Sequence, residues 1–389
     1  KYITIVQSAL LDMTGDGMYK MTAELVNTAG LGGAGMNIGG GSGKNPYITV
    51  TGTGTSVRES IEDQVTREFI DFGAHVKARF FGERFAKSGL APLLEVVARE
   101  RLTDEKGMVT VIKGNRPERI YESMIGMSNT GGEYIENLSR FQSYNTAKGV
   151  FVSNLQFIKD YYTEGKEPVA GLIDLVESEN IPSGNNAVAI QEGGGADSWQ
   201  GSSPRYEIRY EGLAAFKGDK LAGYMDKDEA QYFNILMNKA RAAFITVPVG
   251  EDKSSTALNI FQSATEVKAN VINGKAFIDV TIKAAAGVAQ ESASIDVTKA
   301  RPAKQIEQSF NAMAKEKISG IIKKAQKEFK SDIFGFGDCL HMQRPDIWRN
   351  VKDDWNDVYF ANAEVRVTVK AEIVELGEEK KPFIMKGAY

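Results

Sequence analysis

The sequence is poor in the residue types that most enzymes and metal sites require. Its 389 residues include one cysteine, Cys339, and two histidines, His75 and His341. A structural zinc site takes four Cys or His ligands, so these three residues cannot complete one, and a single cysteine excludes a disulfide within the chain. A Ser-His or Cys-His catalytic unit would have to use one of the two histidines. The composition therefore argues against most enzyme classes and predicts no metal and no cofactor.

An excess of positive charge and long apolar runs are lacking as well. The chain has 47 basic and 51 acidic residues, a formal net charge of −4, and an isoelectric point near 5.6. This balance gives no electrostatic basis for binding nucleic acid. No uncharged apolar run approaches the ~18 residues of a membrane-spanning helix. With 42% hydrophobic and 25% charged residues, the chain is expected to be globular, with two or three domains.

Glycine is in excess, and much of the excess lies in one segment. Ten of the 39 glycines fall between Gly30 and Gly54. The spacing from Gly30 to Gly35 matches a dinucleotide-binding fingerprint, and Gly43-Lys44 looks like the end of a phosphate-binding loop. Neither precedes a predicted helix whose N-terminal amides could hold a phosphate. The segment is therefore interpreted as a surface loop, to which the sequence assigns no role.

Hydrophobic periodicity predicts an N-terminal region over residues 1–200. Strands alternate with helices over about 1–116, the pattern of an α/β unit. The part over about 117–177 is predicted to be mainly helical. Ser, Gly and Asn then supply half of the residues from 178 to 203, and the segment 178–204 is interpreted as a linker.

Residues 205–389 are predicted to form the C-terminal region. It either stays one unit or divides into a small unit at 205–250 and a larger α+β unit at 251–389. Asn273-Gly274 is a strong two-residue hairpin signal and predicts a pair of long strands. An apolar stripe predicts one long helix over about 302–330.

The fold class expected from these patterns is α+β and multidomain. Mixed and antiparallel sheets with packed helices are predicted, in an N-terminal α/β-like unit and a C-terminal sheet covered by long helices.

Aromatic and acidic residues gather late in the chain. Trp348 and Trp355 lie seven residues apart, two helical turns on one face. Core packing is the first interpretation of that spacing and a ligand or partner surface is the second. Asp353 and Asp354 are adjacent, so on a helix they point about 100° apart and do not converge as an acid–base pair. No catalytic residue is proposed.

A basic face on the predicted long helix is the other candidate surface. Its lysines are either a solvated helix face or a contact for an anionic bilayer or an acidic partner. The candidate partner or ligand surface consists of Trp348, Asp353, Asp354, Trp355, Lys323, Lys324 and Lys327.

Motifs spread along the chain resemble those of the Ger(x)C family. Four segments carry the resemblance: Thr51-Gly-Thr-Gly-Thr-Ser-Val-Arg-Glu59, Phe81-Gly-Glu-Arg-Phe-Ala-Lys-Ser-Gly-Leu90, Phe216-Lys-Gly-Asp-Lys220 with its continuation to Ala230, and Asp332-Ile-Phe-Gly-Phe-Gly337. Trp348 and Trp355 follow the last segment at similar spacing. The order and spacing of these segments over most of the chain make the resemblance specific.

The resemblance implies a subunit of a receptor rather than an enzyme. Ger(x)C proteins are the C subunits of bacterial spore germinant receptors, multidomain α+β lipoproteins on the inner membrane of the dormant spore. They act with an integral-membrane A subunit and a B subunit, and they are not known as enzymes. The lipidated Cys of such a protein is expected upstream of Lys1. The function expected is a non-catalytic lipoprotein subunit of a nutrient germinant receptor. The alternative is a soluble module that binds an amino acid or a sugar.

Overall fold

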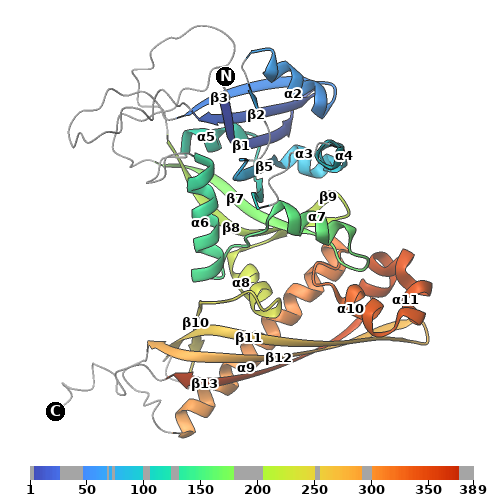
Figure 1. Ribbon diagram of the computed structural model, residues 1–389. Helices are drawn as coiled ribbons and strands as arrows, with labels where there is room; N and C mark the ends of the chain where they lie inside the picture. The colour runs from blue at the N-terminus through green and yellow to red at the C-terminus, as the bar shows by residue number, and fades with distance from the viewer. Residues whose placement is uncertain are drawn as a thin grey trace, which may run out of the picture.

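The structure is a computed structural model with two sheets, one in the N-terminal part and one in the C-terminal part (Figure 1). The residues that it describes are 4–26, 47–67, 70–71, 75–99, 106–123, 131–178, 205–249, 255–290 and 300–375. The two sheets and the helices packed on them form an α+β protein of more than one unit, as the sequence predicts.

The larger sheet contains nine strands in the described part of the chain, in the order β3-β2-β1-β5-β6-β7-β8-β9, with β4 paired to β1. Their bounds are β1 (Thr4–Met13), β2 (Tyr19–Val26), β3 (Tyr47–Gly54), β4 (Ile70–Asp71), β5 (Ala78–Gly82), β6 (Met108–Ile112), β7 (Val169–Ser178), β8 (Arg205–Lys217) and β9 (Lys220–Met225). The central strands β1, β5, β6 and β7 run parallel, and antiparallel pairs flank them on both sides. The predicted α/β layer is therefore present, extended by hairpins at each edge.

Helices of the N-terminal part pack on the faces of this sheet. They are α2 (Val57–Val65), α3 (Glu83–Ser88), α4 (Ala91–Arg99), η1 (Pro117–Arg119), α5 (Ile120–Ser123), α6 (Gly131–Asn145) and α7 (Asn154–Tyr162). The central strand β6 is covered on both faces of the sheet, since all five of its residues are buried. Burial on both faces explains why such strands appear in the sequence as unbroken apolar runs.

The segment 117–177, predicted to be mainly helical, ends in a strand. Among its described residues, η1, α5, α6 and α7 lie between Pro117 and Tyr162, and β7 then begins at Val169. The helical prediction is wrong for β7 because its first half is an apolar run buried in the sheet, and periodicity alone cannot distinguish such a run from a buried helix.

The segment interpreted as a linker, 178–204, joins two neighbouring strands of one sheet. Its residues from 179 onward lie outside the described residues, but β7 and β8 on either side pair antiparallel over ten residue pairs. The larger sheet therefore includes residues 205–225, and the smaller sheet begins after them.

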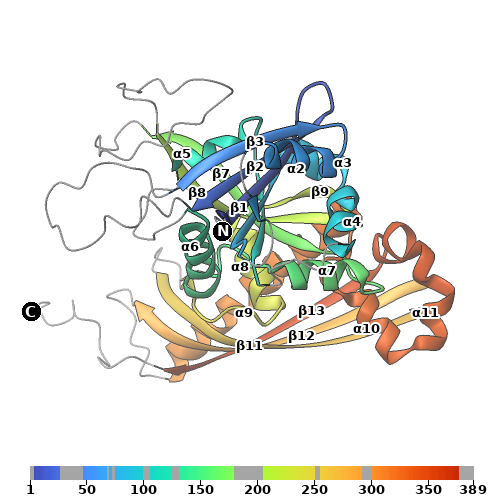
Figure 2. The same cartoon turned by 45° about the horizontal axis from the view of Figure 1, so that its top comes forward.

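The smaller sheet has the order β10-β11-β12-β13, with bounds β10 (Ala243–Pro248), β11 (Ser255–Ile272), β12 (Lys275–Gln290) and β13 (Glu364–Glu375). The predicted hairpin at Asn273-Gly274 is confirmed, since both residues have positive φ and join β11 to β12. β13 then pairs parallel with β12. The long strands form a twisted ribbon (Figure 2).

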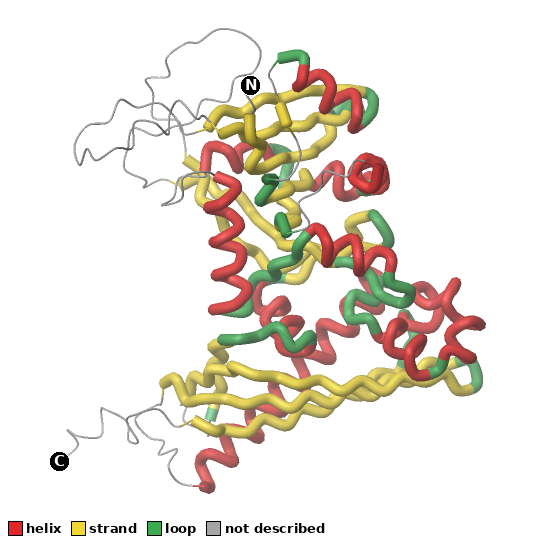
Figure 3. Tube along the Cα trace, in the orientation of Figure 1, coloured by secondary structure: helices red, strands yellow, loops and turns green. Residues whose placement is uncertain are grey.

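Helices of the C-terminal part lie on one face of this sheet and beside its hairpin end. They are α8 (Lys227–Leu236), α9 (Ala300–Lys324), η2 (Ala325–Phe329), α10 (Phe336–Gln343), α11 (Pro345–Val351), η3 (Lys352–Asp354) and η4 (Trp355–Phe360). The stripe of Ile306, Phe310, Ala314 and Ile318 on α9 is fully buried, which confirms the predicted amphipathic helix. In the tube view α8 lies between the two sheets (Figure 3). No helix in the described residues has the length and apolar character needed to cross a bilayer.

Candidate functional site: the junction between the two sheets

The two tryptophans of the candidate surface lie in the core. Trp348 and Trp355 are each 1% exposed, and their rings meet edge to face with centroids 5.5 Å apart. Trp348 Nε1 donates to Glu164 Oε2 at 2.8 Å, and Trp355 Nε1 donates to Asp332 Oδ2 at 2.9 Å. Core packing, the first interpretation of their spacing, is confirmed, and neither ring lines an open surface.

The lysines of the candidate surface have separate roles. Lys324 pairs with Glu229 on α8 at 2.7 Å, and Lys327 Nζ donates to the carbonyl of Ala361 at 2.7 Å. Lys323 is exposed on α9. Two of the three cations thus hold neighbouring elements in place.

The acidic pair of the candidate surface lies apart from the core. Asp353 and Asp354 are exposed in η3. A contact of these carboxylates or of Lys323 with a partner stays a prediction.

The turn at residues 217–220, which carries the Phe-Lys-Gly-Asp-Lys motif, contacts the N-terminal helices. The backbone N–H of Leu90 donates to Asp219 O at 2.9 Å, and the N–H of Ala91 donates to Asp219 Oδ2 at 2.9 Å. Asp219 thereby satisfies unpaired amides at the start of α4. Gly89 has φ +122°, and a Cβ there would lie 2.5 Å from Asp219 Oδ2. The motif ending at Leu90 and the motif at 217–220 therefore meet.

The same turn contacts the C-terminal part on one side and the loop 163–168 on the other. Lys217 Nζ pairs with Asp357 Oδ1 of the C-terminal part at 2.6 Å, whereas the N–H of Gly218 donates at 2.6 Å to Glu167 Oε2 in the loop that precedes β7. Ser331 donates its hydroxyl to the carbonyl of Phe216. The turn is thus bonded to both units, and we call its surroundings the junction: the loop 163–168, the turn 217–220, and residues 331–338 and 355–357.

A buried carboxylate organises the C-terminal side of the junction. Asp332 accepts hydrogen bonds from the backbone N–H groups of Phe334, Gly335 and Gly337 and from the indole of Trp355, at 2.7–3.2 Å. Burial nevertheless raises the pKa of Asp332 to about 6, because the loss of hydration outweighs these four donors. The Asp-Ile-Phe-Gly-Phe-Gly motif is therefore a loop closed on its own first side chain.

Two glycines allow the backbones of the two units to touch. A Cβ on Gly165 would lie 2.4 Å from the carbonyl carbon of Gly337, and one on Gly337 would lie 2.5 Å from Trp355 Nε1. The N–H of Asp338 donates to Gly165 O at 3.0 Å, and the N–H of Glu167 donates to Asp332 O at 2.9 Å. Only glycine permits this approach.

The loop 163–168 is the part of the junction that the sequence analysis missed. Glu164 accepts from Trp348 and lies 3.4 Å from Lys352 Nζ, and these contacts, the indole first, lower the pKa of its carboxyl. Glu167 bonds Gly218 and also accepts from Asn356. Its partners lie 51 to 189 residues away in sequence, so no local pattern announces them.

The cysteine and the second histidine form no nucleophile–base unit. Cys339 Sγ lies 3.3 Å from the carbonyl oxygen of Val267, and burial raises the pKa of its thiol, which disfavours the reactive thiolate. His341 stacks on Trp348 with ring centroids 5.7 Å apart, and its Nδ1 lies 4.0 Å from Glu164. Among the described residues, no three His, Cys, Asp or Glu side chains are grouped to hold a metal ion.

The motif at 51–59 has a local structural role as well. Cβ atoms on Gly52 and Gly54 would lie 2.2 and 2.6 Å from the backbone of Ser60, so these glycines let α2 pack directly on β3. Ser56 caps the helix, accepting from the N–H of Glu59 at 3.1 Å.

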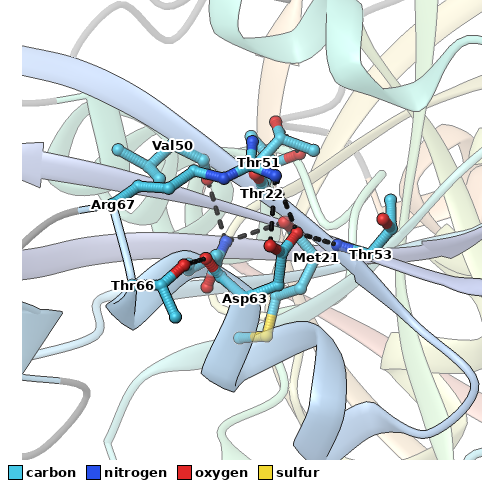
Figure 4. Close-up of polar contacts among 9 residues, drawn as sticks. Met21, Thr22, Val50, Thr51, Thr53, Asp63, Thr66 and Arg67 are labelled. Carbon is cyan, nitrogen blue, oxygen red and sulfur yellow. Dashed lines mark hydrogen bonds and ion pairs between the residues drawn. The ribbon is translucent and has the colours of Figure 1, made fainter. Parts of the chain in front are cut away.

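Polar side chains of α2 cover the outer edge of β3. Asp63 accepts from the N–H of Thr53, and Arg67 donates both to Asp63 and to the carbonyl of Thr51 (Figure 4). All four motifs named from the sequence are thus used for contacts between elements.

The fold and the junction define a class of protein: a two-unit α+β protein in which the sequence motifs at 217–220 and 332–337 lie where the two units meet. Residues 1–175 match the spore germination protein N-terminal domain, and residues 211–377 match the C-terminal domain described as spore germination B3/GerAC like. The chain belongs to the Ger(x)C family.

Relatives cover nearly the whole chain. Spore germination protein KC of Bacillus subtilis (strain 168) is 23% identical over 376 residues, which are 95% of this chain and 88% of KC. Spore germination protein B3 of the same organism is 19% identical over 381 residues, 96% of this chain and 91% of B3. The crystal structure of the GerBC protein is 15% identical and has the same fold, with a TM-score of 0.54 over 94% of this chain and 96% of GerBC.

Proposed function

We propose that this chain is a non-catalytic subunit of a nutrient germinant receptor, held on the spore inner membrane by an N-terminal lipid. It acts there with the A and B subunits. Membership of a family of spore germination proteins supports a germinant-receptor-type role in spore germination.

The junction is the observation that supports a structural rather than a catalytic role for this chain. Its Asp332, Glu167 and Asp219 carboxylates bond backbone amides and side chains of the chain itself. Carboxylates that accept hydrogen bonds from the chain itself rigidify the fold and are not free to bind a substrate. A rigid two-unit body suits a subunit that binds and transmits.

Membrane attachment in the proposal comes from outside the folded units. A single acyl chain gives only marginal membrane binding, so the lipid and contacts with the other subunits would share the attachment. The anchor is tested by growing sporulating cells with a labelled fatty acid and recovering the protein. A full-length protein that takes up no label, or label that persists after its proposed lipid-bearing Cys is replaced by Ser, would overturn the lipoprotein assignment.

Catalysis is tested on the residues that any such mechanism would need. Spores carrying His75→Asn and His341→Asn together are expected to germinate at the wild-type rate, provided that immunoblotting shows equal amounts of the protein. A loss of germination at equal abundance would contradict the non-catalytic role.

The alternative function, a soluble module for an amino acid or a sugar, has less support. Trp348 and Trp355 could have formed its ligand surface, and both are buried. Co-purification of the chain with the A and B subunits from spore membranes separates the two functions, since a soluble module would not follow them.

A further inference from the structure

The smaller sheet has one face that the described helices do not cover. α9 packs on the other face, where β12 buries Ile278, Val280 and Ile282. The alternate residues of β11, β12 and β13 point away from α9 and are exposed or half-buried. Figure 2 shows α9 behind these long strands, with no described helix in front of them.

Near the hairpin end of this face, charged side chains are paired. Three ion pairs lie there, at 3.0–3.7 Å: Lys275 with Glu364, Lys268 with Glu266, and Arg366 with Asp279. This end of the face is electrically neutral by itself.

Farther along, two lysines lie side by side. Lys283 on β12 and Lys370 on β13 are direct partners in the parallel ladder. Both are exposed, and neither forms an ion pair or a hydrogen bond with any residue that the structure describes. Like charges on adjacent strands destabilise a sheet, so this arrangement carries a cost in the isolated chain.

The lysines border a groove of about 610 Å³, which we call the lysine groove. Its floor is low because Ala264 and Ala285 stand where larger side chains would fill it. Glu372 forms its other side together with Glu307, which reaches the edge of β13 from α9 and is fixed there because it accepts from the N–H of Ile373 at 3.0 Å. The groove therefore presents a pair of cations beside a pair of anions.

We infer that the lysine groove docks a protein segment of another receptor subunit, which places a carboxylate between Lys283 and Lys370. This inference rests on the proposed function. A carboxylate there neutralises the repelling cations, and a basic residue on the same segment meets Glu372 or Glu307. An anionic bilayer fits less well, because Glu372 and Glu307 border the same groove and would approach its headgroups.

The test reverses both charges in the full-length chain, Lys283→Glu with Lys370→Glu. The matched control reverses two exposed lysines of α9, Lys315→Glu with Lys317→Glu, so the change in net charge is equal. Tagged proteins are isolated from spore membranes, and the A and B subunits that accompany them are quantified. The groove variant is expected to retain less than a tenth of the subunits that the wild type retains, while the control retains the wild-type amount.

The outcomes separate the inference from the function on which it rests. If the wild type brings down no A or B subunit, the proposed function fails. If the wild type brings down these subunits, two results overturn docking in the lysine groove. In one, the groove variant retains as much of the subunits as the wild type; in the other, the control variant loses as much as the groove variant. Loss of binding to vesicles that contain anionic phospholipid, with subunit retention unchanged, would identify a membrane contact instead. Displacement of the subunits by free amino acids would indicate a small-molecule site.

A stability measurement guards against misfolding as the cause. Lys283→Gln removes the repulsion and is expected to raise the midpoint of thermal unfolding by roughly 1 °C while weakening retention of the subunits. A variant that is both less stable and less well retained would point to a structural role for Lys283 and would contradict the inference.

Discussion

At the scale of single residues, the chain uses buried carboxylates as fixed acceptors for backbone amides. Asp332 bonds three amides and an indole, and Glu24 accepts from Ser8 and from the N–H groups of Gly131 and Gly132 at the start of α6. In both places burial raises the pKa of the carboxyl. Such groups specify one arrangement of the chain at an electrostatic cost.

Replacing Asp332 by Ala should destabilise the protein by on the order of 3 kcal/mol or more, because four buried donors lose their acceptor. Urea unfolding measures the change. Asp353→Ala is the control, since that side chain is exposed and its removal should cost less than about 0.5 kcal/mol. Equal losses from the two substitutions would contradict the assigned role of Asp332.

The same carboxyl makes stability depend on pH with a definite sign. The pKa of Asp332 is about 6 in the folded chain against an ordinary value of 3.8 for an aspartate, so between about pH 4 and 6 the folded state binds more protons than the unfolded state. Its contribution to the free energy of unfolding therefore falls as pH rises through that window. Unfolding at several pH values should show the wild type losing stability relative to Asp332→Asn. A difference that stays constant from pH 4 to 7 would exclude a raised pKa.

Gly165 is expected to tolerate no side chain. Gly165→Ala should cost about 3 kcal/mol, since its Cβ would overlap Gly337. Gly274→Ala is a matched control because its φ of +76° nearly equals the +79° of Gly165 but no atom lies within 4 Å of a Cβ there. It should cost only about 1 kcal/mol. Thermal unfolding of both variants measures the two costs: Gly274→Ala introduces backbone strain alone, and Gly165→Ala introduces the same strain together with steric overlap.

At the scale of elements, helices protect the exposed edges of both sheets with polar side chains. Asp63 of α2 and Arg67 in the turn after it bond the backbone of β3. Asn311 and Glu307 of α9 accept from the N–H groups of Ala371 and Ile373 on β13. An uncovered edge strand is a template for pairing with another chain. These side chains therefore limit edge-to-edge association.

Removing the cover of β13 should promote self-association. Asn311→Ala leaves the N–H of Ala371 without its acceptor, which should cost about 1–2 kcal/mol. Light scattering during storage is expected to show larger species than for Gln308→Ala, whose side chain is exposed on the same helix. A monodisperse Asn311→Ala protein would show that the cap is not needed against association.

At the scale of the whole molecule, the junction couples two sheets that have their own strand order and their own helices. The coupling runs through the turn 217–220, the loop 163–168 and residues 331–338. Bonds of this kind let a change at one sheet reach the other, which a receptor subunit needs.

Cutting the junction should separate the unfolding of the two sheets. The combination Glu167→Ala with Ser331→Ala removes the bond of Glu167 with Asn356 and the bond of Ser331 with Phe216, which both join the two units. Calorimetry is expected to show one transition for the wild type and a broadened or split transition for the variant. Removal of the exposed Lys275–Glu364 pair, which lies within one sheet, is the control and should leave one transition. A single sharp transition in the junction variant would contradict the coupling.

The sequence by itself determined most of the local structure. The apolar stripe predicted α9, and Asn273-Gly274 predicted the hairpin of β11 and β12. The capping box that starts α8 is likewise formed by residues close together, Asp226 and Glu229. These features depend on residues close together in the chain, so they can be predicted from the sequence without knowledge of the tertiary structure.

Only the tertiary structure decided what the signature motifs do. Hydrophobic periodicity did not identify β7 as a strand, because a strand buried on both faces lacks the alternation of apolar and polar residues. The tryptophans could have lined a surface, and they became core once Glu164 and Asp332 met their indoles from 184 and 23 residues away. The lysine groove exists only because β12 and β13 pair in a register that brings Lys283 beside Lys370, 87 residues later in the sequence. Contacts at such separations depend on how the elements pack, and packing is a property of the folded chain.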